Sequence, residues 1–127
     1  MAAAAVCLVA AGLVRATLPS SEFTVTWMHS IEKTRWEERY VVAGSSLSLV
    51  EARVQALGAG MEPPDGAELR DGWWRWRPRT TPLTDLRLTY STFTQDYTIC
   101  AAQRCASLRE LVGVPLDQGD VVSLKAC

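Results

Sequence analysis

The chain lacks most of the features that mark the common functional classes. It has one histidine, and its 13 basic and 14 acidic residues leave a formal net charge of −1. A nearly neutral chain has no basic field to neutralise nucleic-acid phosphates or to bind an anionic membrane surface. It also has no G-x-S-x-G element, which positions the nucleophile of many hydrolases. With 127 residues, it is too short for a barrel enzyme or a two-domain enzyme. We therefore expect one domain and no nucleic-acid partner.

The chain has no uncharged run long enough to span a bilayer as a helix, which takes ~20 residues. Residues 2–14 are uncharged and match the apolar region of a secretory signal, although no Lys or Arg precedes Arg15. We predict a signal-like leader over residues 1–16, cleaved after Ala16, and a single domain over residues 17–127. The protein would then be exported to the periplasm or another extracytoplasmic compartment, and a retained leader would hold it at the membrane. The alternative is an Ala-rich helix that packs on the domain.

The cysteines fit an exported protein, because disulfides persist in oxidising compartments. Cleavage after Ala16 leaves Cys100, Cys105 and Cys127. Cys100 and Cys105 fall opposite each other if residues 101–104 form a hairpin tip. Alternatively, Cys127 pairs with one of them and fixes the C-terminal strand. A zinc site built from the three thiols and His29 is a weaker alternative, because this spacing is not typical of metal sites. We expect no metal and no cofactor.

Short runs of alternating apolar and polar residues dominate the rest of the chain, and turn residues separate them. This pattern predicts an all-β fold, a small antiparallel β-sandwich or partly open barrel of about seven to eight strands. The expected strands cover residues 23–28, 36–42, 47–56, 73–77, 86–90, 97–101 with a return through Cys105, and 121–126.

Two local patterns are more specific. Leu47 and Leu49 alternate in one phase, whereas Ala52 and the apolar residues after it alternate in the other, so we predict a β-bulge near Val50. Residues 107–112 predict one or two helical turns, with Ser107 as the N-cap and Glu110 completing a capping box.

Polar residues interrupt the predicted apolar strand faces. Glu38 shares a face with Trp36 and Tyr40, and a carboxylate there needs a partner. We predict that Arg53 is that partner, with Glu51 beside it on the Arg53 face. The lone histidine, His29, ends the row of Phe23, Val25 and Trp27, where a hydrogen-bonded structural role is the alternative to ligand binding.

Three of the five tryptophans lie within residues 73–76. In a strand, Trp74 and Trp76 share one face and Trp73 lies on the other. One interpretation is that these tryptophans pack in the core and under a loop. The alternative is that they form an aromatic docking surface, with Arg75 and Arg77 beside it.

Several of these motifs together resemble a bacterial family. The blocks are W-x-H-S-x-E-K-T-x-W-x-E from Trp27, E-A-R from Glu51, G-A-G-M-E-P-P from Gly58, D-G-W-W from Asp71, the Cys100-x4-Cys105 pair and Cys127. The chain resembles, over about residues 22–127, the domain-of-unknown-function family numbered eighteen-fifty. Members of that family are often encoded beside the fused permease of TAXI-type TRAP transporters. The resemblance implies an exported accessory protein of a solute uptake system. It implies no established activity, because the family has no catalytic residues to carry over, and we expect that the protein is not an enzyme.

Three functional hypotheses follow. The first is a β-domain that binds the TRAP permease, its solute-binding protein or a small acidic solute, which His29 and Arg53 would hold. The second is a small hydrolase or metal-dependent enzyme that uses His29 with Glu38 or Glu51. The third is a purely structural subunit of a membrane complex. For the first, the candidate residues are His29, Glu32, Glu38, Glu51, Arg53, Gly58, Gly60, Met61, Trp27 and Trp36.

Overall fold

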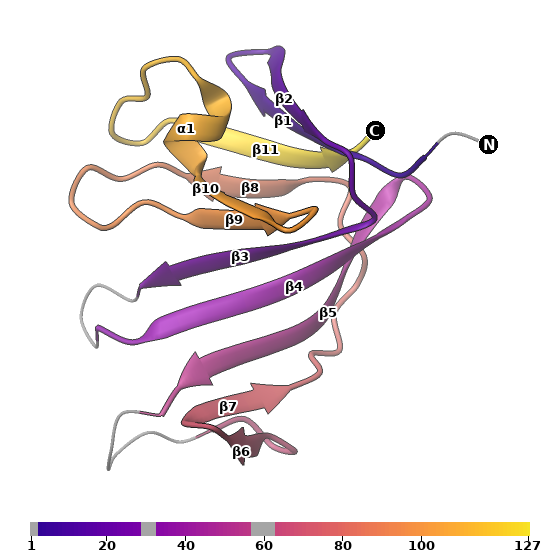
Figure 1. Cartoon of the computed structure of the whole chain (residues 1–127), viewed down its shortest axis with the longest axis vertical. Helices are drawn as coiled ribbons and strands as arrows, with labels where there is room; N and C mark the ends of the chain where they lie inside the picture. Colours follow the sequence, from indigo (N-terminus) through magenta and orange to yellow (C-terminus); the bar gives the residue numbers. More distant parts are fainter. Residues whose placement is uncertain (1–2, 29–32, 57–62) are drawn as a thin grey trace.

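Two antiparallel sheets make up the domain, as a computed structural model shows for residues 3–28, 33–56 and 63–127 (Figure 1). The four-stranded sheet has the order β2-β1-β11-β8, and the seven-stranded sheet has the order β10-β9-β3-β4-β5-β7-β6. The all-β sandwich prediction is confirmed. The strands are β1 (Val6–Ala10), β2 (Leu13–Leu18), β3 (Glu22–Met28), β4 (Arg35–Ala43), β5 (Ser46–Gln55), β6 (Glu68–Arg70), β7 (Trp73–Trp76), β8 (Leu86–Thr89), β9 (Thr98–Ala101), β10 (Arg104–Ser107) and β11 (Val121–Ala126).

The segment predicted as a leader is folded into the domain. β1 lies between β2 and β11, and Val6 and Leu8 are completely buried. The predicted boundary after Ala16 falls inside β2, so the domain in this structure begins at β1, and the alternative of an Ala-rich helix is wrong. An uninterrupted apolar run has no polar residues to reveal its period of two. For that reason a buried strand and the apolar part of a signal look alike in sequence.

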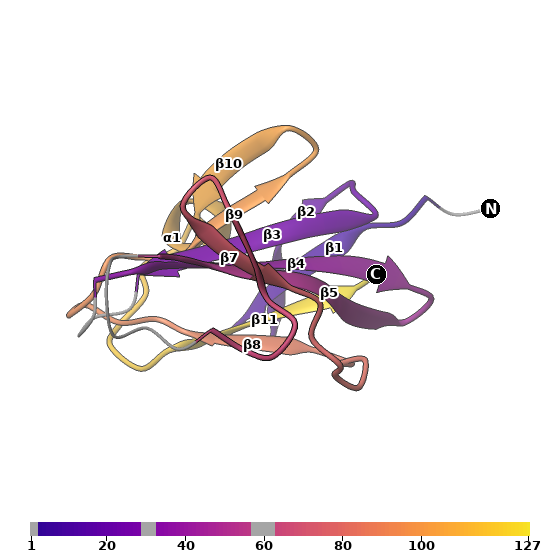
Figure 2. The ribbon, with the colours of Figure 1, turned by 90° about the horizontal axis from the view of Figure 1, so that it is seen from below.

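The core lies between the two sheets. Its completely buried side chains come from both sheets and from α1 (Leu108–Val112), and they include Leu8, Leu47, Leu108 and Leu124. Figure 2 shows β8 and β11 on one side of the long β3, β4 and β5 strands. At the far end of Figure 1, β7 and β6 extend away from the four-stranded sheet. Among the described residues, no helix is long and apolar enough to cross a membrane.

The predicted irregularities are confirmed. Arg39 pairs with Glu51 and Tyr40 pairs with Leu49, so Val50 is the extra residue of a β-bulge. Ser107 is the N-cap of α1, and its hydroxyl and the Glu110 carboxylate form the capping box. The bulge moves Leu47 and Leu49 to the core face while Glu51 and Arg53 stay on the opposite face.

β6 is the strand of the large sheet that the sequence did not predict, and it forms a hairpin with the predicted strand β7. Asp71 and Gly72 form its turn with φ angles of 52° and 83°, which is typical of the two-residue turns that close hairpins. β6 has only three residues, and all are exposed. A strand this short and polar carries no hydrophobic pattern to detect.

Candidate functional site

The predicted pair of Glu38 and Arg53 is wrong, because the two side chains lie on opposite faces of the seven-stranded sheet. Directly opposed residues of an antiparallel pair share a face, and Arg53 is opposite Glu37, whereas Glu38 is opposite Ala52. We call the face that carries Glu38 and Tyr40 the inner face, because it continues into the core. The face that carries Glu37 and Arg53 is the outer face.

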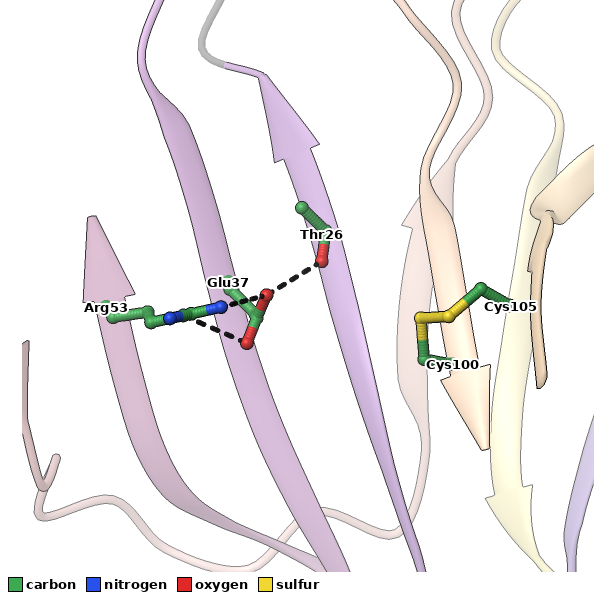
Figure 3. The surroundings of a disulfide bond; sticks show 5 residues. All are labelled: Thr26, Glu37, Arg53, Cys100 and Cys105. Atoms are coloured by element: carbon green, nitrogen blue, oxygen red, sulfur yellow. Dashed lines mark hydrogen bonds and ion pairs between the residues drawn. A yellow bond between two sulfur atoms is a disulfide. The ribbon is translucent and has the colours of Figure 1, made fainter. Parts of the chain in front are cut away.

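On the outer face, Arg53 forms a two-point ion pair with Glu37 (Figure 3). Its Nε lies 3.0 Å from Glu37 Oε1 and its Nη2 lies 3.1 Å from Oε2. The Thr26 hydroxyl donates to Oε2 of the same carboxylate at 3.3 Å, and the Arg53 guanidinium lies 4.0 Å above the Trp73 ring. Arg53 is therefore neutralised and held in place, which favours a structural role over the predicted capture of an acidic solute.

The outer ion pairs continue through Glu51. Its carboxylate lies 3.9 Å from an Arg39 nitrogen and 3.5 Å from an Arg75 nitrogen. Glu51 is opposite Arg39, whereas Glu38 is opposite Ala52. The two carboxylates therefore lie on opposite faces of the sheet. Because these pairs are partly exposed, each contributes ~1 kcal/mol or less to stability.

Glu38 lies on the inner face between apolar neighbours, opposite Val25 on β3 and Ala52 on β5. The Tyr40 hydroxyl donates to Glu38 Oε1 at 3.1 Å. Burial raises the pKa of Glu38, and the Tyr40 hydrogen bond only partly opposes that rise. Burial and the neighbouring Glu38 charge raise the pKa of Tyr40 as well. Glu38 is thus a carboxyl group whose charged form the fold disfavours.

Replacing Glu38 with Gln should make the domain more stable at neutral pH. The raised pKa means that the wild-type domain is stabilised by the neutral acid at low pH and loses that stability as the pH rises through the folded-state pKa. Glu38→Gln removes this loss and keeps an acceptor for Tyr40. Urea unfolding at several pH values should show a higher free energy of unfolding for Glu38→Gln than for wild type at pH 7. This difference should shrink as the pH falls toward 4.5, the ordinary glutamate pKa. A Glu38→Gln protein less stable than wild type at pH 7 would contradict this account.

Half-buried tryptophans extend the inner face beyond the core. Trp36, Trp74 and the exposed Leu69 follow one another across β4, β5, β7 and β6, with buried Val54 between the tryptophans. The Trp76 ring meets Trp36 edge-on at 6.1 Å. We call Trp36, Trp74, Trp76 and Leu69 the tryptophan wall. Among the described residues, none of the four belongs to the core cluster or to the partly buried hydrophobics packed against it.

The tryptophan wall joins the core through Trp27. The Trp27 ring stacks on Trp36 at 6.3 Å, so the structure brings these two predicted site residues together. Trp36 Nε1 is buried and makes no hydrogen bond with the part of the chain that the structure describes. Five of the predicted site residues lie outside the described residues: His29, Glu32, Gly58, Gly60 and Met61.

The structure has two disulfide bonds, Cys100–Cys105 and Cys7–Cys127, and only the first was predicted from the sequence. Cys100 and Cys105 pair across the β9–β10 hairpin and are bonded, as predicted. The alternative partner for Cys127 is wrong, because Cys127 is bonded to Cys7. This pairing was missed because cleavage after Ala16 would remove Cys7. With all four cysteines in disulfides, the three-thiol zinc alternative is also wrong. No cluster of three potential metal ligands occurs within residues 3–28, 33–56 and 63–127.

Comparison with known families gives one match for this chain. The family model for DUF1850, a domain of unknown function, matches residues 23–108. The chain belongs to the DUF1850 family. No curated protein and no solved structure matches it. The matched span of this DUF1850 domain includes the whole tryptophan wall and the Glu37–Arg53 pair, whereas β1, β2 and β11 lie outside it. Leu69 is the wall residue that sequence reasoning missed, since β6 gave no strand pattern.

Proposed function

We propose that this DUF1850 domain is an exported accessory subunit of a TRAP-type solute uptake system and that it acts by binding the transporter permease rather than by catalysis. Two disulfides suit an oxidising, extracytoplasmic compartment. The resemblance in the sequence supports the choice of partner, because family members are often encoded beside a TRAP permease.

The tryptophan wall is the observation that supports docking. Aromatic side chains are enriched at protein interfaces, and the most important ones lie partly buried among apolar neighbours. Trp36, Trp74 and Trp76 have this half-buried arrangement, and Leu69 beside them is 55% exposed. β7 and β6, which carry Trp74, Trp76 and Leu69, lie at the end of the large sheet farthest from the four-stranded sheet (Figure 1).

Replacing Leu69 with Asp should strongly reduce recovery of the permease. The change places a charge in the wall, and a buried unpaired charge at an interface is strongly unfavourable. The measurement is affinity purification of the tagged protein from its native membrane, with the permease quantified by mass spectrometry. We expect at least about a tenfold loss, equivalent to ~1.4 kcal/mol.

The matched control is Leu13→Asp, because Leu13 is 58% exposed and lies on β2 of the other sheet. It should leave permease recovery unchanged. Thermal unfolding of both variants checks that neither change disrupts the fold. Equal permease recovery with Leu69→Asp and with wild type would overturn docking through the wall. Failure of the wild-type protein to recover the permease would overturn the accessory role itself.

A further inference from the structure

A charged groove is lined mainly by outer-face residues, and Trp76 of the tryptophan wall also contributes to its lining. It runs along β5, β7 and β6 and has a volume of about 790 Å³. Sites for small molecules usually have volumes of ~300–1,000 Å³. Its lining consists mainly of charged side chains, so it suits a charged solute better than an apolar one.

Four arginines line the groove: Arg70, Arg75, Arg77 and Arg79. Arg75 pairs with Glu51 through Nη1, and its side chain remains 35% exposed. Neither Arg77 nor Arg79 has a carboxylate within 4.0 Å among the described residues. Counting only the residues that the structure describes, three guanidinium groups therefore keep unused donors at this groove, and a ligand carboxylate could accept hydrogen bonds from them.

Two carboxylates in the same groove also have no basic partner among the described residues. Asp65 and Asp71 line it, and within the described ranges neither has an Arg or Lys nitrogen within 4.0 Å. The lining as a whole contains four arginines and four carboxylates, so it has no net charge with which to attract a simple anion or cation. The complementary ligand is a molecule that carries both charges.

We propose that this groove binds a small zwitterionic solute of the α-amino acid class. Arg75, Arg77 and Arg79 hold its carboxylate, because a guanidinium matches a carboxylate with two parallel hydrogen bonds. Asp65 and Asp71 accept hydrogen bonds from its ammonium group. The groove shares Trp76 with the wall that docks the permease, but its charged residues are not part of that wall, so solute binding stands whether or not that docking occurs.

Titration of the full chain, with both disulfides intact, tests the proposal. The probes are L-glutamine, succinate with two carboxylates and no ammonium, and 1,4-diaminobutane with two ammonium groups and no carboxylate. Isothermal calorimetry should show saturable binding of L-glutamine, at least about tenfold tighter than either other probe. The proposal is overturned if succinate or the diamine binds as tightly, or if no probe saturates up to about 10 mM.

Variants locate the site. Arg77→Ala with Arg79→Ala should weaken L-glutamine binding by at least about tenfold. Arg87→Ala with Arg104→Ala removes the same charge from exposed positions on β8 and β10 and should change nothing. Asp65→Asn with Asp71→Asn should remove the preference for L-glutamine over succinate. Thermal unfolding confirms that each variant is folded. Equal weakening by the two arginine pairs, or an unchanged preference in the asparagine variant, contradicts this site.

Discussion

Deleting residues 1–16 should leave a chain that does not fold. The deletion removes β1, with the buried side chains of Val6, Leu8 and Ala10, and most of β2. Each large core side chain lost costs ~2–5 kcal/mol, whereas a whole domain is stable by only ~5–15 kcal/mol. The deletion also leaves the edge of β11 without the partner that pairs with four of its residues.

Circular dichroism and a proton–nitrogen NMR spectrum measure this result directly. The control is deletion of residues 1–4, which keeps Ala5, whose carbonyl accepts a hydrogen bond from the Cys127 amide. That protein should give the spectrum of the full chain. A folded monomer from the longer deletion would support cleavage after Ala16 instead. Intact mass of the protein recovered from cells provides an independent check, and we expect a chain that retains Val6.

Replacing both Cys7 and Cys127 with Ser should lower the free energy of unfolding more than replacing both Cys100 and Cys105 with Ser. The bond joins residues 120 apart in sequence, whereas Cys100 and Cys105 are 5 apart. A cross-link stabilises by restricting the unfolded chain, and the effect grows with the loop that it closes. The chain-entropy relation gives ~5 kcal/mol for the long loop and ~2 kcal/mol for the short one.

Urea unfolding without reductant compares the two double variants with wild type. Cys100→Ser with Cys105→Ser is the matched control, since it removes the same atoms from the other disulfide. The Cys7 and Cys127 variant should have the lower midpoint. The reverse order would mean that native-state packing, rather than restriction of the unfolded chain, sets the contribution of each bond.

Sequence reasoning succeeded where the polar and apolar residues alternate visibly. Most of β3, β4, β5 and β11 could be located this way, and the shift of phase near Val50 revealed the bulge. Two kinds of strand could not be found. β1 is apolar almost throughout, so it shows no period of two, and β6 has only three residues, which is too few to establish one.

The candidate site was predicted less well because it depends on pairing between strands. Alternation within β4 correctly placed Glu38 with Trp36 and Tyr40. Alternation does not specify the register of β4 against β5, and in the observed register Arg53 is opposite Glu37. The tryptophan wall likewise depends on β6, which brings Leu69 opposite Trp74. The residue types indicated that ion pairs and aromatic contacts would form, but only the order and register of the strands show which residues meet.

The Cys7–Cys127 bond also determines how the domain responds to mechanical force. Its two Cα atoms are 5.9 Å apart, and the residues between them form a covalently closed ring. A pull applied at residue 7 and at residue 127 is carried by the sulfur–sulfur bond, so neither sheet bears the load. While that bond is intact, the domain is a nearly inextensible link between anything attached at its two ends. After reduction the sheets would bear the load, and their unfolding would let the chain between the two cysteines, a sequence separation of 120, extend by ~3.3–3.6 Å per residue.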